Sequence, residues 1–271
     1  MKQIIVPTDF SKGAWNALLY ALDIGEALGI REILILNSYY APHAGASTLG
    51  SIDRVMQQDS ENGLREWTNK IKEAGLSAKF NFHSKSVHAT LVEGLNSQVH
   101  DYNDSLIVIG SLGHTGAVDK IFGSNASDVA AESKCPVMVI PAEAKYTSCK
   151  ELVLGSDFDQ IDERNLRILK TIDALDPSTK LKIVRVVNKS KPLSTADGDG
   201  ISQDDLPHST LEISGDNVSN ALDEYVSNNR TDLLVLIKKE TGFFESMFHR
   251  SVTKKLALLA HVPLLVLKRV A

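Results

Sequence analysis

One pattern of short apolar runs occurs twice along the chain, and this internal repeat constrains the fold more than any other feature of the sequence. The run at residues 3–10, Gln-Ile-Ile-Val-Pro-Thr-Asp-Phe, is echoed at residues 151–158 by Glu-Leu-Val-Leu-Gly-Ser-Asp-Phe. Later runs recur in the same way: residues 233–236 echo 106–109, and residues 262–266 echo 135–139. A polar stretch at residues 142–150 reads as a linker between the copies. We therefore predict two tandem domains, at residues 1–144 and 148–271.

The two copies differ in length. The aspartates of the first run and of its echo lie 148 positions apart, whereas the prolines of the last run and its echo lie 127 apart, so the second copy is 21 residues shorter in its middle. There the first copy has a polar-faced helical pattern at residues 52–74, while the second has residues 188–208, rich in Ser, Asp, Gly, Lys and Pro. Such a composition predicts a loop. The second domain should therefore lack one covering helix.

In the first copy, apolar runs alternate with helical patterns. Strands are expected at residues 3–7, 33–36, 78–84, 106–109 and 137–140. Helices are expected between the N-cap Ser11 and the stop Gly29, at 52–74, at 90–102 and around 124–133, with a loop over 39–51. This alternation predicts an α/β fold of two tandem doubly wound, Rossmann-like modules, each a five-stranded parallel sheet flanked by helices. In such sheets ligands bind beyond the carboxyl ends of the strands, where the strand order reverses.

A glycine motif follows the expected strand at 106–109. Gly110 and Gly113 precede Gly123-Ser124 with the spacing Gly-x2-Gly-x9-Gly-Ser, and a helix is expected to begin there. Glycine lets the backbone approach an anion closely or adopt positive φ. A helix N-terminus adds free N–H groups and the positive end of the helix dipole. The arrangement of strand, glycine loop and helix start therefore suits a phosphate group, and Asp9, which follows another strand, should lie at the same edge.

The second copy does not keep this motif. Ile237, Glu240 and Arg250 occupy the positions of the three glycines. Their side chains fill the space that a phosphate would need and Glu240 repels it, so we expect no nucleotide site of the first kind there. Lys238 and nearby cations would make a different kind of site. The aromatic cluster at residues 243–248 either packs on the sheet or presents an apolar surface.

Composition and charge exclude several classes of protein. The 271 residues are 43% apolar and 23% charged, as in ordinary globular proteins, and the net charge of −5 gives no support to nucleic-acid or anionic-membrane binding. No apolar run is long enough to span a bilayer, and the N-terminus enters the first strand without a signal-peptide pattern, so we expect a cytoplasmic protein. Cys135 and Cys149 predict neither a zinc site nor a disulfide framework, and we expect reduced thiols. No catalytic residue and no metal ligand is assigned.

Taken together, these motifs resemble a known family. The run Pro7-Thr8-Asp9-Phe10-Ser11, the glycine–serine spacing, and Cys-Pro-Val-Met-Val-Ile at residues 135–140 are similar to motifs of the universal stress protein family, across both halves of the chain. The resemblance implies a fold of the adenine-nucleotide α-hydrolase-like type. It also implies dimerisation through the last strand, which tandem members reproduce by pairing their two halves. We therefore expect pairing of the two modules within one chain, with or without a homodimer.

The resemblance also implies a nucleotide site for ATP, alone or with Mg²⁺, in the first module. Asp9 matches the acidic residue that contacts the adenosine part, and Pro7 lies beside it. Ser38 matches a backbone contact to adenine, although Asn37-Ser38 stands where the family has His-Val. Ile109 and Gly110 match positions near the ribose. Gly113, Gly123, Ser124 and Asn125 match the phosphate loop, and Asn125 replaces a small apolar residue there.

Three functions stay open. The first is a universal stress response protein that binds ATP in its first module and acts as a regulatory, signalling protein. The second is an enzyme such as a slow ATPase, although the sequence has no P-loop or nucleotidyl-transferase motif, and His83, Lys85 and His88 show no metal-ligand spacing. The third is a scaffold or a carrier of a small ligand or lipid, suggested by the degenerate second module.

Overall fold

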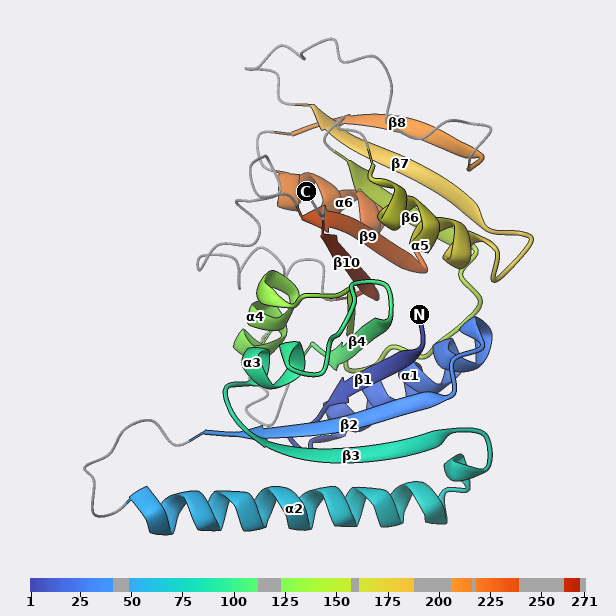
Figure 1. Cartoon of the computed structure of the whole chain (residues 1–271). Coiled ribbons are helices and arrows are strands. Elements are labelled where there is room, and N and C mark those ends of the chain that lie inside the picture. Colours follow the sequence, from blue (N-terminus) through green and yellow to red (C-terminus); the bar gives the residue numbers. More distant parts are fainter. Residues whose placement is uncertain are drawn as a thin grey trace.

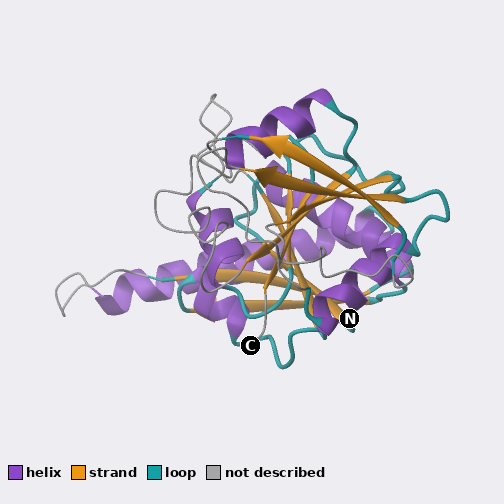
Figure 2. Cartoon of the chain, turned by 90° about the horizontal axis from the view of Figure 1, so that it is seen from above, coloured by secondary structure: helices purple, strands orange, loops and turns teal. Residues whose placement is uncertain are grey.

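The computed structural model contains a ten-stranded sheet between two layers of helices (Figures 1 and 2). It describes residues 1–40, 49–111, 123–156, 161–187, 206–215, 218–238 and 261–268. The strands are β1 Gln3–Pro7, β2 Glu32–Tyr39, β3 Asn81–His88, β4 Ser105–Gly110, β5 Val137–Ile140, β6 Glu151–Ser156, β7 Lys180–Val187, β8 His208–Ser214, β9 Leu233–Lys238 and β10 Leu264–Lys268. The helices are α1 Lys12–Leu28, α2 Leu49–Glu73, the 3-10 turn η1 Leu76–Ala78, α3 Leu91–Asn96, α4 Ser124–Glu132, α5 Glu163–Asp173 and α6 Val218–Asn228. The predicted α/β class is confirmed.

The sheet consists of two five-stranded halves joined at their last strands. The strand order is β3-β2-β1-β4-β5-β10-β9-β6-β7-β8, so each half has the same order when followed outward from the centre. All neighbours are parallel except β5 and β10, which pair antiparallel with Met138 opposite Leu265. The two sheets of the prediction are thus joined edge to edge.

Helices cover both faces of the sheet. The core on one face joins α1, α2 and α5 to the sheet, and the core on the other face joins α3, α4 and α6 to it. Figure 2 shows these helices on either side of the strands. Strands β4 and β9 are buried on both faces, as expected for central parallel strands.

Helix α1 begins and ends at the predicted residues. The Ser11 side chain accepts a hydrogen bond from Ala14 N at 3.1 Å, which satisfies one of the free N–H groups of the first turn. Gly29 ends the helix in the left-handed conformation, with φ 71°.

Strand β2 extends beyond its predicted residues, whereas β3 is displaced toward the C-terminus: it begins at Asn81, and residue 78, where it was predicted to begin, ends the turn η1. The predictions were residues 33–36 and 78–84, but the two strands pair continuously from Glu32–Asn81 to Tyr39–His88. Main-chain pairing with β3 extends β2 past its apolar residues. Burial is not the cause, because β3 is the edge strand and most of its residues are exposed. The predicted loop at 39–51 accordingly loses its first residue to β2 and its last residues to α2.

Helix α3 is shorter than the predicted helix at 90–102, because a tertiary contact ends it at Asn96. The Asn96 side chain donates to Glu132 O at 3.2 Å and accepts from Lys134 N at 2.8 Å, which ties the end of α3 to the end of α4. No pattern of apolar residues signals such a bond.

The second half is less covered than the first. Helix α2 packs on β2 and β3, whereas in the described part of the second half no helix covers β7 and β8 in that way. Strand β8 is largely exposed, with Leu211 at 40%. Residues 188–205 of the predicted loop lie outside the described residues, and His208, predicted to end that loop, begins β8.

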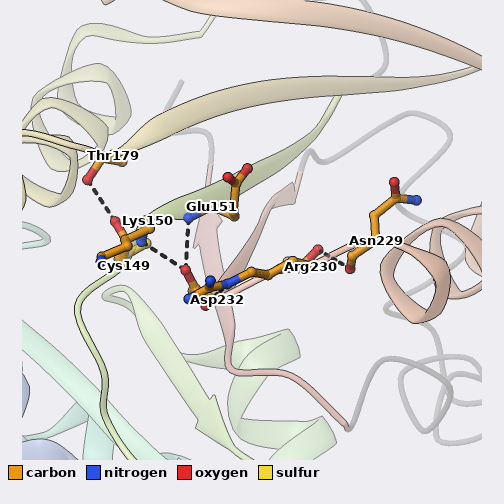
Figure 3. Close-up of polar contacts among 8 residues, drawn as sticks. Cys149, Lys150, Glu151, Thr179, Asn229, Arg230 and Asp232 are labelled. Atoms are coloured by element: carbon orange, nitrogen blue, oxygen red, sulfur yellow. Dashed lines mark hydrogen bonds and ion pairs between the residues drawn. The ribbon is translucent and has the colours of Figure 1, made fainter.

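The predicted polar linker is firmly attached to both halves. In the first half, Asn16 Nδ2 donates to Pro141 O and Ala144 O at 3.2 and 3.0 Å. In the second, Cys149 O accepts from Thr179 Oγ1 at 2.7 Å (Figure 3). The linker is therefore a packed connection and not a free tether.

A carboxylate completes the attachment of the linker to β6. Asp232 Oδ2 accepts from Lys150 N and Glu151 N, both at 2.9 Å, and Arg230 Nε lies 3.4 Å from Asp232 Oδ1 (Figure 3).

Cys149 and Cys135 are free and buried, and burial raises the pKa of each thiol to about 12, so both are protonated at neutral pH.

Candidate functional site

The carboxyl ends of β1, β2 and β4 surround a cavity of about 260 Å³. It lies between β1 and β4, where the strand order reverses, which is the position expected for a ligand in such a sheet. Every predicted site residue that the structure describes lines this cavity, and Gly113 lies outside the described residues. The lining residues are Pro7, Thr8, Asp9, Ala14, Asn37, Ser38, Leu91, Ile109, Gly110, Ser111, Gly123, Ser124, Asn125 and Ala126.

Asp9 belongs to a tight turn between β1 and α1. Its Oδ1 accepts from Ser11 N at 3.1 Å, and Thr8 Oγ1 accepts from Phe10 N at 2.8 Å. The N-cap of α1 is Ser11, so the Asp9 carboxylate is not used as the helix cap. These short bonds hold a negative charge at the wall of the cavity.

Gly110 is a glycine because two backbones approach closely. A Cβ at this position would lie 2.9 Å from Gly13 O and 3.1 Å from Gly13 C, in the first turn of α1. The positive φ that we considered for this motif is found neither here nor at Gly123, whose φ is −62°. Gly123 would place a Cβ 3.3 Å from Ser111 O.

Helix α4 points its N-terminus at the cavity. It begins at Ser124, as predicted, and its N-cap Gly123 supplies no side-chain hydrogen bond. The first-turn N–H groups of Ser124 and Asn125 therefore have no acceptor within the helix. Both residues are exposed, and the positive end of the helix dipole adds to their attraction for an anion.

A side-chain bond joins the second strand to the first at the cavity. Asn37 Nδ2 donates to Thr8 O at 2.6 Å and so ties the end of β2 to the end of β1. Ser38 and Leu91 line the same side, from β2 and α3.

Sequence reasoning left several lining residues unassigned. They are Thr8, Ala14, Asn37, Leu91, Ser111 and Ala126. Thr8, Asn37, Ser111 and Ala126 adjoin assigned residues, and that adjacency was the available signal. Ala14 and Leu91 line the cavity from α1 and α3. No local sequence pattern predicts that these two residues lie at the cavity.

In the second half, Lys238 is the residue considered for a different kind of anion site that the structure describes. It donates from Nζ to Ala131 O at 2.6 Å, near the C-terminal end of α4. It thereby contacts the first half. Asp157 and residues 239–260, with Glu240, Arg250 and the aromatic cluster, lie outside the described residues.

His83 and Lys85, at the edge of the sheet, are engaged in surface contacts. His83 pairs with Glu32 at 3.2 Å and Lys85 donates to Gln98 Oε1 at 2.9 Å, all on exposed side chains. Within the described ranges, no group of three or more His, Cys, Asp or Glu residues is arranged to hold a metal ion. None of the described helices is long and apolar enough to cross a membrane.

The fold and the cavity together define a Rossmann-like α/β protein with a cavity at the switch point of its sheet. Comparison with known sequences gives the family: the Universal stress protein family matches residues 1–141, and the chain belongs to that family.

Individual relatives agree with this assignment. A universal stress protein of Methanocaldococcus jannaschii is 25% identical over 152 residues, which cover 53% of this chain and 84% of the relative. The crystal structure of a universal stress protein from Archaeoglobus fulgidus superimposes with a TM-score of 0.70 at 21% identity, covering 98% of this chain and 96% of that one, and thus shares the fold. The alignment with a universal stress protein solved in complex with cAMP covers 52% of this chain and 98% of that one, with 20% identity and a TM-score of 0.39, which is too low to bear on this site.

Proposed function

We propose that this protein binds ATP, alone or with Mg²⁺, in the cavity of its first half and acts as a regulatory protein of the universal stress response. The observation that carries the proposal is the convergence on one cavity of Asp9, the glycine backbone at Gly110 and Gly123, and the N-terminus of α4, which has no side-chain cap among the described residues. A carboxylate and a positive helix end in the lining of one cavity suit a ligand that carries both hydroxyl groups and phosphates.

The charges set the direction of the nucleotide. Because a carboxylate repels phosphate, Asp9 belongs at the ribose, whose hydroxyl groups donate hydrogen bonds to it. Ile109 and Gly110 lie at the same sugar, and the phosphates extend to Ser124 and Asn125, at the first turn of α4. The adenine ring then rests beside Ser38 and Leu91.

The two halves take different parts in this proposal. The nucleotide module is residues 1–144, and residues 148–271 form a sister module of the same fold that binds no nucleotide in the same manner. Antiparallel pairing of β5 with β10 supports the view that the modules act as one body. Partners that bind the second module could then respond to whether the first module holds nucleotide. We expect the protein in the cytoplasm.

Calorimetric titration of the full chain with ATP tests the proposal. Asp9→Ala should weaken ATP binding by about 10–100-fold, the usual effect of losing hydrogen bonds to a charged group. Asp59→Ala is the matched control, since Asp59 is exposed on α2 and does not line the cavity. Equal affinity in the wild type and in Asp9→Ala would contradict the proposal. Phosphate release in the same samples measures any slow hydrolysis.

A second cavity favours a second candidate, a carrier of a small apolar molecule. It has a volume of about 290 Å³ and lies between α1 and α5, over the junction of the two halves. Its walls include Ile24 of α1, Ile168 of α5, and Met138 and Leu265 of the central strand pair. Mass spectrometry of the purified protein separates the candidates: a co-purified adenine nucleotide supports the first, and an apolar molecule supports the second.

A further inference from the structure

Phe10 has an unusual backbone. Its φ is 65°, and it is the one residue other than glycine with positive φ in the described chain. A bulky side chain is rarely found in this left-handed region, so surrounding contacts must hold it there. Phe10 directly follows Asp9, the residue that we place at the ribose.

Short hydrogen bonds on both sides fix this turn. Phe10 N donates to Thr8 Oγ1 at 2.8 Å, and Ser11 N donates to Asp9 Oδ1 at 3.1 Å. The Asp9 carboxylate is therefore oriented by the same backbone that carries the strained residue. A shift of Phe10 moves Asp9 with it.

The Phe10 ring is held by helix α2. It meets Trp67 edge-on, with ring centroids 6.1 Å apart, and Trp67 in turn meets Trp15 at 5.2 Å. At Gly63, a Cβ would lie 2.4 Å from two carbons of the Phe10 ring. Glycine is unfavourable within a helix, and here it leaves the space that the ring occupies.

We propose that Phe10 and Gly63 form a positioning contact through which α2 sets the affinity of the cavity for its ligand. Neither Gly63 nor any other α2 residue is among the described residues that line the cavity, so α2 acts on the ligand indirectly. The close approach of Gly63 to the Phe10 ring connects α2 to the turn that holds Asp9. This inference rests on the proposed nucleotide function and adds a control element to it. A movement of α2 would change the affinity for the nucleotide although α2 itself does not contact the nucleotide.

The test is a set of ATP titrations of the full chain in two backgrounds. Gly63→Ala should weaken ATP binding about tenfold, because a displaced Asp9 loses its charge-assisted hydrogen bonds to the ribose. In an Asp9→Ala background, Gly63→Ala should leave the remaining affinity unchanged. Asn62→Ala, at the neighbouring exposed position of α2, is the matched control and should bind as the wild type does.

A second variant approaches the contact from the other side. Phe10→Gly tolerates the left-handed backbone and removes the side chain that meets Gly63, so it should fold even if Gly63→Ala does not. It should also lower affinity, but only where Asp9 is present. In its background Gly63→Ala should have no effect on binding and should no longer lower the urea midpoint, since alanine is favoured over glycine within a helix.

The outcomes separate this inference from the function on which it rests. If the wild type does not bind ATP, the proposed function fails and this inference falls with it. If the wild type binds ATP and the effect of either variant on affinity is the same with and without Asp9, the positioning contact alone is refuted. A merely structural role would lower the urea midpoint equally in both backgrounds and would show no such dependence on Asp9.

Discussion

Replacing Gly110 by alanine tests why the motif has a glycine at the end of β4. The added Cβ would lie 2.9 Å from Gly13 O and 3.1 Å from Gly13 C. Both are backbone atoms of α1, and they cannot move aside as the end of a flexible side chain would. Either α1 moves away from β4 or the strand end shifts, and both movements change the cavity wall.

The magnitude follows from two opposing effects. Overpacking of this kind costs about 1–3 kcal/mol. Alanine also restricts the unfolded chain, and because the backbone of Gly110 is not left-handed, this offsets about 0.4–1 kcal/mol. We therefore expect Gly110→Ala to lower the free energy of unfolding by about 1.3 kcal/mol, the difference between the midpoints of these two ranges.

Urea denaturation at 25 °C is the assay, followed by tryptophan fluorescence and by circular dichroism. Both tryptophans, Trp15 and Trp67, lie in the first half, so fluorescence reports on the half that carries the change. Gly94→Ala is the control, because its Cβ would meet neighbours only at 3.6 Å or more, and it should stabilise α3 by about 0.5–1 kcal/mol. If Gly110→Ala is as stable as the wild type and binds ATP equally well, the close approach of Gly13 is not the reason for the glycine.

Two further predictions concern the junction of the halves. Tyr102 OH donates to the buried Asn165 Oδ1 at 3.0 Å and accepts from Lys268 N at 2.7 Å, so Tyr102→Phe should lower the urea-derived stability by about 1–3 kcal/mol, and an unchanged midpoint would exclude this network as a stabilising element. Burial, followed by the nearby Lys238 charge, lowers the pKa of Lys268 from 10.5 to about 8. Because the unfolded state keeps this proton up to the higher pKa, Lys268 should make stability rise with pH between about 8 and 10.5. The difference in stability between the wild type and Lys268→Met, measured by urea titration across that range, should show the rise, and a flat difference would count against the assigned burial.

The sequence predicted features that depend on local chemistry and on repetition. Ser11 and Gly29 marked the ends of α1, Ser124 marked the start of α4, and the alternation of apolar runs indicated the mostly parallel sheet. The residues expected at the carboxyl edge do line one cavity, because parallel strands bring their ends to the same edge.

Features that depend on tertiary contact were missed or misread. Helix α3 ends at Asn96 because that side chain bonds to the end of α4, which no helical periodicity records. Gly110 is needed for the close approach of Gly13 rather than for positive φ. Positive φ occurs instead at Phe10, where the residue type does not predict it. The bond from Lys238 Nζ to Ala131 O of the other half is likewise a tertiary contact that the sequence did not indicate.

The central claim is that the chain is built around one nucleotide site, in its first half. A crystal structure of the full chain grown with ATP and Mg²⁺ tests this most directly. We predict ATP in the cavity at the ends of β1 and β4, with its ribose at Asp9 and its phosphates at the first turn of α4, and no nucleotide at the ends of β6 and β9. ATP bound only in the second half, or a first-half cavity without ATP at saturating concentration, would contradict the account.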